Sequence, residues 1–197
     1  MSGFYSVIVG KEDMLYDKDI RDPLFDYLEE NYGKIRVIDE KQLGKNTRAD
    51  MFMVTEDTFV GFEIKSDADT YQRLDRQVKG YDLFCDKNYI VAGMRHGKHV
   101  AEHVPDYWGI LLVEHNNGQV LFHKVREAQW NPCCKKEKQL SVLWREEIDH
   151  ILSKNKMPKY KQKAKSYIIG RMLLKLDYEL LKKQVCEELF QRDYTLV

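Results

Sequence analysis

The sequence lacks the features that mark membrane, secreted and disordered proteins. Its 197 residues contain no run of eighteen apolar residues, so no segment is expected to span a membrane. The first ten residues carry neither the basic stretch nor the cleavage site of a signal peptide. Only four cysteines are present, and the adjacent pair Cys133 and Cys134 does not suit a disulfide framework, so we expect a reducing compartment, the cytoplasm. Aromatic residues make up 12% of the chain, which argues against disorder.

The formal net charge of zero conceals an uneven distribution of charged residues. Residues 1–134 hold 17 basic and 23 acidic residues, a net charge of −6, whereas residues 135–197 hold 15 and 9, a net charge of +6. A basic surface beside an acidic domain suits an enzyme that handles a polyanion, but a charge run is also what a solvated face shows. Eight basic residues and no acid separate Asp149 from Asp177: Lys154, Lys156, Lys159, Lys161, Lys163, Lys165, Arg171 and Lys175.

The hydrophobic period changes several times along the chain, which predicts a succession of helices and strands. Helical spacing covers residues 19–32 and 69–85, and a short helix is expected before the last two strands. The strands are expected at residues 34–38, 49–54, 59–65, 88–93, 108–114 and 119–125. This mixed order predicts an α/β fold with a central sheet flanked by helices.

The chain changes character near Asn131, where a proline follows and the pattern becomes helical to the end. Helices are expected over residues 138–153 and 164–191. We therefore expect a sheet domain over residues 1–131 and a basic helical subdomain over residues 132–197, which packs on the sheet as a C-terminal extension.

The densest group of polar residues lies on two neighbouring strands of this expected sheet. Alternation along a strand places Glu63 and Lys65 on one face and Ile64 on the other, and a hairpin brings Asp50 close to them. Charged residues in such apolar strands are costly unless they are paired or bind a cation. Two carboxylates beside one ammonium leave a net negative site of the kind that a hard divalent ion binds through oxygen ligands.

A simpler interpretation stays open for this group. An ordinary solvent-facing strand could carry Glu63 and Lys65 as a same-face ion pair worth about 0.2–1 kcal/mol. The helix that follows favours a functional site, because Asp69, Arg73, Gln77 and Tyr81 recur every four residues and form one polar stripe. A glutamine there could orient a water or a phosphate oxygen, whereas Tyr81 either contacts nucleic acid or closes the edge of the core.

The pattern of Asp50, twelve intervening residues, Glu63-Ile64-Lys65, a helix and then Gln77-x-x-x-Tyr81 resembles the PD-(D/E)XK nuclease superfamily. The spacing of Gln77 and Tyr81 is similar to the branch that contains RecB-type and λ-exonuclease-type nucleases, and residues 63–74 look like small bacterial and phage members. The resemblance covers residues 17 to 125 and implies a restriction-endonuclease-like mixed sheet. One departure is Ala49, which stands where the motif has proline.

The resemblance implies a role for each residue of the group. Asp50, Glu63 and the backbone carbonyl of Ile64 would bind Mg²⁺ or Mn²⁺, and Lys65 would contact the scissile phosphate and the attacking water. Gln77 and Tyr81 would support the site or the substrate. A further acidic ligand is expected from earlier in the chain, with Glu40 as first choice and Glu29 or Asp19 as alternatives. Candidate contacts to the substrate are Arg48, Arg73, Lys161, Lys163 and Lys165.

The expected function is therefore hydrolysis of DNA phosphodiester bonds by a metal-activated water, with nucleic acid as the partner and no membrane. A homodimer stays open, because many nucleases cut two strands by dimerising. An alternative is a catalytically silent nuclease fold that binds nucleic acid or a protein, for example in a conflict between phage and host. RNA also stays open as the substrate, because no side chain is identifiable as a reader of the 2′-hydroxyl. Zinc is not expected, since His99 and His103 lack the glutamate of a metalloprotease motif.

Overall fold

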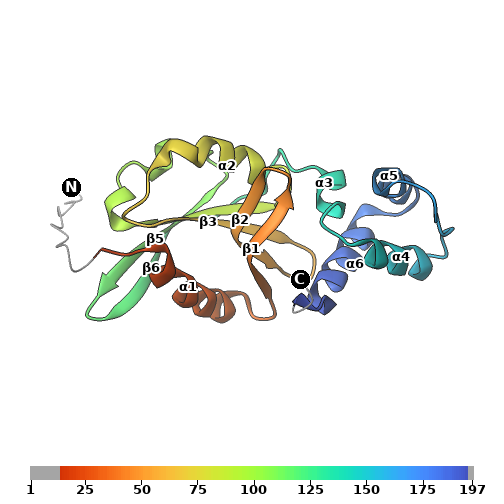
Figure 1. The fold of residues 1–197 in the computed structure, drawn as a ribbon. Coiled ribbons are helices and arrows are strands. Elements are labelled where there is room, and N and C mark those ends of the chain that lie inside the picture. Colours follow the sequence, from red (N-terminus) through yellow and green to blue (C-terminus); the bar gives the residue numbers. More distant parts are fainter. Residues whose placement is uncertain (1–13, 195–197) are drawn as a thin grey trace.

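A computed structural model of the chain describes residues 14–194, so the opening residues that were searched for a signal peptide lie outside the described part. The elements follow one another as a helix, three strands, a helix and three more strands, and four helices end the chain (Figure 1). The helices are α1 (Asp17–Tyr32), α2 (Leu74–Tyr81), α3 (Lys136–Leu140), α4 (Arg145–Lys154), α5 (Lys165–Lys175) and α6 (Tyr178–Gln191). The strands are β1 (Arg36–Gly44), β2 (Thr47–Val54), β3 (Phe59–Lys65), β4 (Lys87–Gly93), β5 (Gly109–Asn116) and β6 (Gln119–Arg126).

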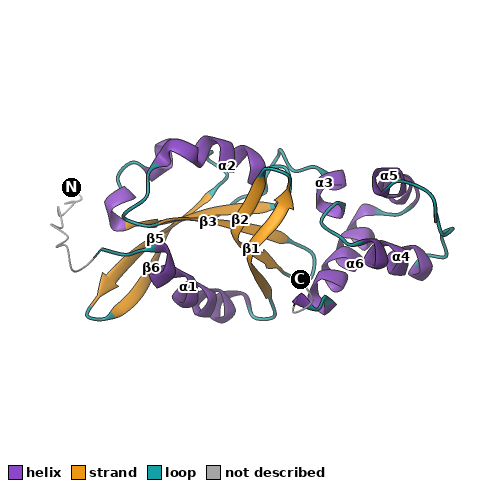
Figure 2. Cartoon of the chain, in the orientation of Figure 1, coloured by secondary structure: helices purple, strands orange, loops and turns teal. Residues whose placement is uncertain are grey.

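The six strands form one mixed sheet in the order in which they occur in the chain (Figure 2). Antiparallel pairing joins β1, β2 and β3, and α2 then provides the crossover that makes β4 parallel to β3. The pairing of β4 with β5 is also parallel, and β6 returns antiparallel at the far edge. The expected α/β fold, with a central mixed sheet between helices and a helical C-terminal part, is confirmed.

The two faces of the sheet carry separate hydrophobic clusters because side chains alternate along each strand. Ile20, Leu24 and Leu28 form the buried stripe of α1, and they pack with Phe62 and Ile64 on one face. On the other face, side chains of α2 and of the C-terminal helices belong to one cluster; in Figure 1, α2 covers the sheet opposite α1 and the C-terminal helices lie beside the end of the sheet. Glu63 and Lys65 therefore lie on the side of α2, opposite Ile64.

Three expected helices differ from the structure, each for a local reason. The segment 69–85 is a short 3₁₀ turn followed by α2, because the Asp69 carboxylate accepts hydrogen bonds from the backbone N–H and hydroxyl of Ser66 instead of entering a helix. The segment 138–153 is divided between α3 and α4, where the Ser141 hydroxyl donates to the carbonyl of Lys138 at 2.7 Å. The segment 164–191 is divided at Asp177, whose carboxylate caps α6.

The first strand is longer than expected, since β1 continues through a polar stretch to Gly44. The sequence hides this part of the strand because Asp39, Glu40, Lys41 and Gln42 show no apolar alternation. The strand lies at the edge of the sheet, where its side chains need little burial.

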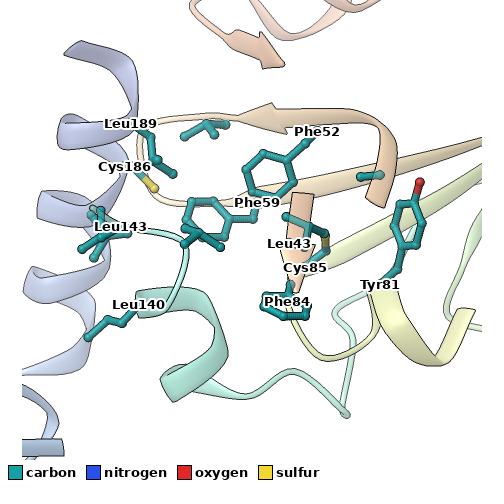
Figure 3. Close-up of a cluster of buried hydrophobic side chains, with 14 of the residues drawn as sticks. Leu43, Phe52, Phe59, Tyr81, Phe84, Cys85, Leu140, Leu143, Cys186 and Leu189 are labelled. Carbon is teal, nitrogen blue, oxygen red and sulfur yellow. The ribbon is translucent and has the colours of Figure 1, made fainter. Parts of the chain in front are cut away.

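The C-terminal helices share a hydrophobic cluster with the sheet (Figure 3). Phe52 and Phe59 of the β2–β3 hairpin pack against Leu143, and Cys186 and Leu189 of α6 complete this contact. The cluster crosses the boundary expected near residue 131. Within residues 14–194, none of the helices is long and apolar enough to cross a membrane.

Candidate functional site

The site begins where β2 and β3 stop pairing. The ladder between them extends from Val54 opposite Phe59 to Met51 opposite Phe62, and Asp50 lies just beyond it. The backbone of Asp50 is instead held by side chains: its N–H donates to the Tyr81 hydroxyl at 2.9 Å, and its carbonyl accepts from Arg21 at 2.9 Å. The strands can thus separate at this point without leaving these backbone groups unpaired.

Tyr81 is the residue that makes this separation possible. Its side chain is fully buried, and its hydroxyl accepts from Asp50 N–H and donates to the Phe62 carbonyl at 3.0 Å, so it bridges the two strands. The ring passes over Gly61, where a Cβ atom would lie 2.5 Å from Cδ1 of Tyr81. Burial, together with the charges of Glu63 and Asp50, raises the pKa of Tyr81 and keeps the phenol neutral.

Glu63 and Lys65 form a buried ion pair on the side of α2, as strand alternation predicts. Nζ of Lys65 lies 2.5 Å from Oε1 of Glu63 and 3.2 Å from Oε1 of Gln77. The side chain of Glu63 is 0% exposed and that of Lys65 is 5% exposed. An ordinary solvent-facing strand is therefore excluded, because both charges lie inside the protein.

The Asp50 carboxylate reaches across to β3. Its Oδ2 accepts a hydrogen bond from the N–H of Ile64 at 2.8 Å, so it lies beside the Glu63–Lys65 pair. Its Oδ1 lies 4.0 Å from the guanidinium of Arg21, and the side chain retains 22% exposure. Asp50 therefore forms the solvent side of the site and Glu63 the buried side.

Burial and mutual repulsion disfavour the ionised form of both carboxyls. Burial, followed by the charge of Asp50, raises the pKa of Glu63 to about 7, although Lys65 acts in the opposite direction. Burial also raises the pKa of Asp50, against the N–H of Ile64 and the charges of Lys65 and Arg21. A cation placed between two such carboxyls would stabilise the ionised form of both.

The donor set fits a divalent cation of the Mg²⁺ or Mn²⁺ type. Oε2 of Glu63 is buried and has no hydrogen-bond partner within residues 14–194, so one carboxylate oxygen is left for a ligand. Asp50 supplies a second set of oxygens from the neighbouring strand. Hard cations of this kind use few protein carboxylates and retain several waters, so two acids are sufficient.

A third acid does not join these two. In the part of the chain from 14 to 194, no group of three or more His, Cys, Asp or Glu side chains could hold a metal. Glu40 was the expected third ligand, but its carboxylate is taken up by Arg21 at 2.6 Å and Arg48 at 2.7 Å. It adopts a left-handed conformation with φ of 49° opposite Asp50, and this places it among the arginines at the rim.

Two members of the expected polar stripe do not share its face. Asp69 lies before α2 and binds Ser66, whereas Tyr81 is enclosed in the core and cannot stack on nucleic acid. Gln77 lies at the site, where its Oε1 accepts a hydrogen bond from Lys65 at 3.2 Å. Arg73 lies exposed at the N-terminus of α2.

The remaining expected substrate contacts are scattered. Arg48 is 65% exposed and is bound to Glu40. Lys161 and Lys163 are exposed in the helical extension, which packs on the Phe59 end of β3. Glu63 and Lys65 lie towards the other end of that strand, and the strand is about 20 Å long. Lys165 is not available to a substrate, because its ammonium donates to the carbonyls of Ser141 and Leu143.

The sequence pattern does not indicate how important Arg21 is to this site. One guanidinium binds Asp17 on its own helix, the carbonyl of Asp50 and the carboxylate of Glu40. Its spacing of four residues from Asp17 is the only signal in the sequence, and many surface helices show such spacing.

Comparison with known proteins identifies a family for the whole chain. The model of the family described as bacteriophage P4 protein cII matches residues 10–195. The chain belongs to the bacteriophage P4 protein cII family. The match to the P4 cII family includes both the sheet with its candidate site and the C-terminal helices. A search of curated proteins found no match.

One solved structure resembles the fold in part. It is a protein of unknown function from Silicibacter pomeroyi, with 20% sequence identity and a TM-score of 0.42. The similarity covers 65% of this chain and 81% of that one. Because the function of that protein is unknown, the similarity says nothing about chemistry.

Proposed function

We propose that this member of the P4 cII family is a nuclease of the PD-(D/E)XK type, which hydrolyses DNA phosphodiester bonds with Mg²⁺ or Mn²⁺. The observation that carries the proposal is the convergence of Asp50, Glu63 and Lys65, with one buried Glu63 oxygen left unpaired. Burying two carboxyls and an ammonium costs stability unless a ligand compensates for it. An ion pair with a purely structural role would need only one carboxylate beside Lys65, either Asp50 or Glu63, and not both.

In this proposal each side chain has a distinct task. Asp50, Glu63 and the carbonyl of Ile64 would hold the cation. When bound, the cation lowers the pKa of water and offsets charge on the scissile phosphate. The ammonium of Lys65 would donate to a phosphate oxygen and orient the attacking water, and Gln77 keeps that ammonium in place. The water would lose a proton to solvent as its oxygen bonds to phosphorus, the bond to the leaving oxygen would break, and that oxygen would take up a proton from solvent, which gives a phosphate monoester and a hydroxyl group.

A cleavage assay with point variants tests the proposal directly. We expect the wild-type chain to cut linear, circular or single-stranded DNA when Mn²⁺ is supplied, and Asp50→Ala, Glu63→Ala and Lys65→Ala to abolish cutting while the circular dichroism spectrum is kept. Asp75→Ala is the matched control, because Asp75 is an 82% exposed carboxylate on α2 that binds only Lys79.

Two results would overturn this assignment. Variants of Glu63 or Lys65 that cut at the wild-type rate would exclude the mechanism. Binding of DNA or RNA without metal-dependent cleavage of any substrate would identify a nuclease fold that acts only as a binding protein.

A further inference from the structure

A groove outside the candidate site follows the exposed edge of the sheet. It has a volume of about 630 Å³ and lies between β1 and the turn that joins α3 to α4. Every residue from 36 to 43 lines it. Side chains alternate between the two faces of a strand, so a groove that touches eight consecutive residues must follow the edge rather than one face.

The edge of β1 that forms this groove has no partner strand. In the described chain the sheet starts at β1, which pairs only with β2. None of the backbone hydrogen bonds between elements of residues 14–194 ends on β1. An edge of this kind offers unpaired N–H and C=O groups to a further extended chain.

Two cations of β1 that line this groove are not paired with a carboxylate of the described residues. Arg36 and Lys41 lie over the ring of Tyr194 at 4.9 and 5.7 Å, and within residues 14–194 neither forms an ion pair. Lys165 adds a third positive charge on the opposite wall, where its ammonium is bonded to the carbonyls of Ser141 and Leu143. The two acids of the same strand, Asp39 and Glu40, are bound by Arg21 on the side of α1.

A buried ion pair lies beneath the opposite wall. Arg192 is bound to Glu147 at 2.5 Å under Trp144, with its guanidinium 4.2 Å from the centre of the indole ring, and its Nη1 has no hydrogen-bond partner within the described residues. Burial, together with the charges of Arg192 and Lys165, lowers the pKa of Lys41 to about 8. An anion in the groove would relieve this repulsion.

We propose that the groove along β1 binds an acidic polypeptide segment in extended conformation, which adds a seventh strand to the sheet. Backbone groups of β1 would pair with the segment, and Arg36 and Lys41 would meet carboxylates on its side chains. The same cations repel basic segments, so the edge selects its partner by charge. The proposal is independent of the nuclease assignment.

The test uses the full chain, labelled with ¹⁵N, and a capped hexapeptide of sequence Glu-Val-Glu-Thr-Glu-Val. We expect the amide signals of residues 36–43 to shift on titration, and Lys41→Gln to weaken binding by at least about tenfold, because a charged hydrogen-bond partner is lost. Lys45→Gln is the matched control: it removes an exposed lysine from the turn after β1 and should leave the affinity unchanged.

Three further probes separate this proposal from its rivals. The same peptide with N-methyl groups at alternate residues should not bind, because it cannot pair with β1, and a Lys-Val-Lys-Thr-Lys-Val peptide should not bind either. The proposal is wrong if the methylated peptide binds equally well, if millimolar acidic peptide leaves residues 36–43 unshifted, or if only a decamer of deoxythymidylate shifts them. The last result would make the groove a nucleic-acid site.

Discussion

Tyr81 supports the backbone of both strands at the candidate site, although it is the last residue of α2 in the sequence. One hydroxyl joins the N–H of Asp50 to the carbonyl of Phe62 at the point where β2 and β3 separate. The hydroxyl therefore takes the place of a backbone hydrogen bond and holds the backbone of Asp50. Asp50 depends on it, because the other support of its backbone is the single bond from Arg21.

Removing that hydroxyl tests this positioning role. Tyr81→Phe leaves two buried backbone groups unpaired, so we expect the free energy of unfolding in urea to fall by about 1–3 kcal/mol. If the proposed nuclease assignment holds, cleavage should fall as well, because Asp50 loses its support. Tyr107→Phe removes a comparable hydroxyl that donates to Asp82 at 2.6 Å, and it should leave cleavage unchanged. Equal cleavage by both variants would exclude the positioning role.

Glu63 makes stability depend on pH. Its pKa rises from an ordinary 4.5 to about 7 in the folded chain, so between these values the unfolded chain binds fewer protons than the folded chain. We expect the free energy of unfolding, measured in EDTA, to fall by roughly 3 kcal/mol as the pH rises from about 4.5 to about 7. Glu63→Gln should lack this part of the pH dependence, and identical profiles for the two proteins would contradict the expectation.

At the scale of elements, the C-terminal helices are attached to the sheet through Asp86. Its carboxylate accepts hydrogen bonds from the N–H of Phe59 at 2.7 Å and from Gln139 of α3 at 2.7 Å, and it forms an ion pair with Lys182 of α6 at 2.7 Å. Lys182 is 3% exposed and also lies over the ring of Phe59. A buried charge held by three elements links the helices to β3.

Breaking this link should be costly. Lys182→Met keeps the volume of the side chain but leaves Asp86 without its cation, so we expect the free energy of unfolding to fall by roughly 3 kcal/mol. Lys183→Met is the control at the next position, because Lys183 is half exposed and lies 3.7 Å from an exposed Glu56; it should cost less than about 1 kcal/mol. Similar losses for the two variants would show that Asp86 does not depend on Lys182.

The sequence predicts the elements best where apolar alternation is strong. The strands around Glu63 and the face that this residue shares with Lys65 follow from alternation alone. The polar end of β1 could not be predicted, because an edge strand needs no apolar face. Helix ends also escaped prediction where a side chain bonds its own backbone, as at Asp69 and Asp177. The rim was the least predictable part, since the position of Glu40 depends on its left-handed backbone and on two arginines.

At the scale of the whole molecule, the basic helices and the candidate site lie towards opposite ends of β3. The helices cover Phe52 and Phe59 at the hairpin that joins β2 to β3, whereas Asp50 and Glu63 lie away from that hairpin. The uneven charge of the two halves of the sequence is therefore separated in space. The sheet also depends on the helices to bury one of its two hydrophobic clusters.

Removing the helices tests whether the sheet is an independent unit. We expect residues 1–131 alone to lack a cooperative thermal transition by circular dichroism, because the truncation exposes Phe52, Val54 and Phe59 to water. Binding of a hydrophobic dye should rise accordingly. A truncated chain that melts cooperatively would contradict this dependence and would support two separable domains.

The absence of a side chain at Gly61 constrains how relatives of this protein can diverge. Any larger residue would strike the ring of Tyr81, because even a Cβ atom would lie 2.5 Å from it. The two positions are thus expected to change together during evolution, with a bulky residue at one accompanied by a small residue at the other. A relative that has made this exchange has lost the phenol that supports Asp50, so the pair distinguishes lineages that keep the site from those that have abandoned it.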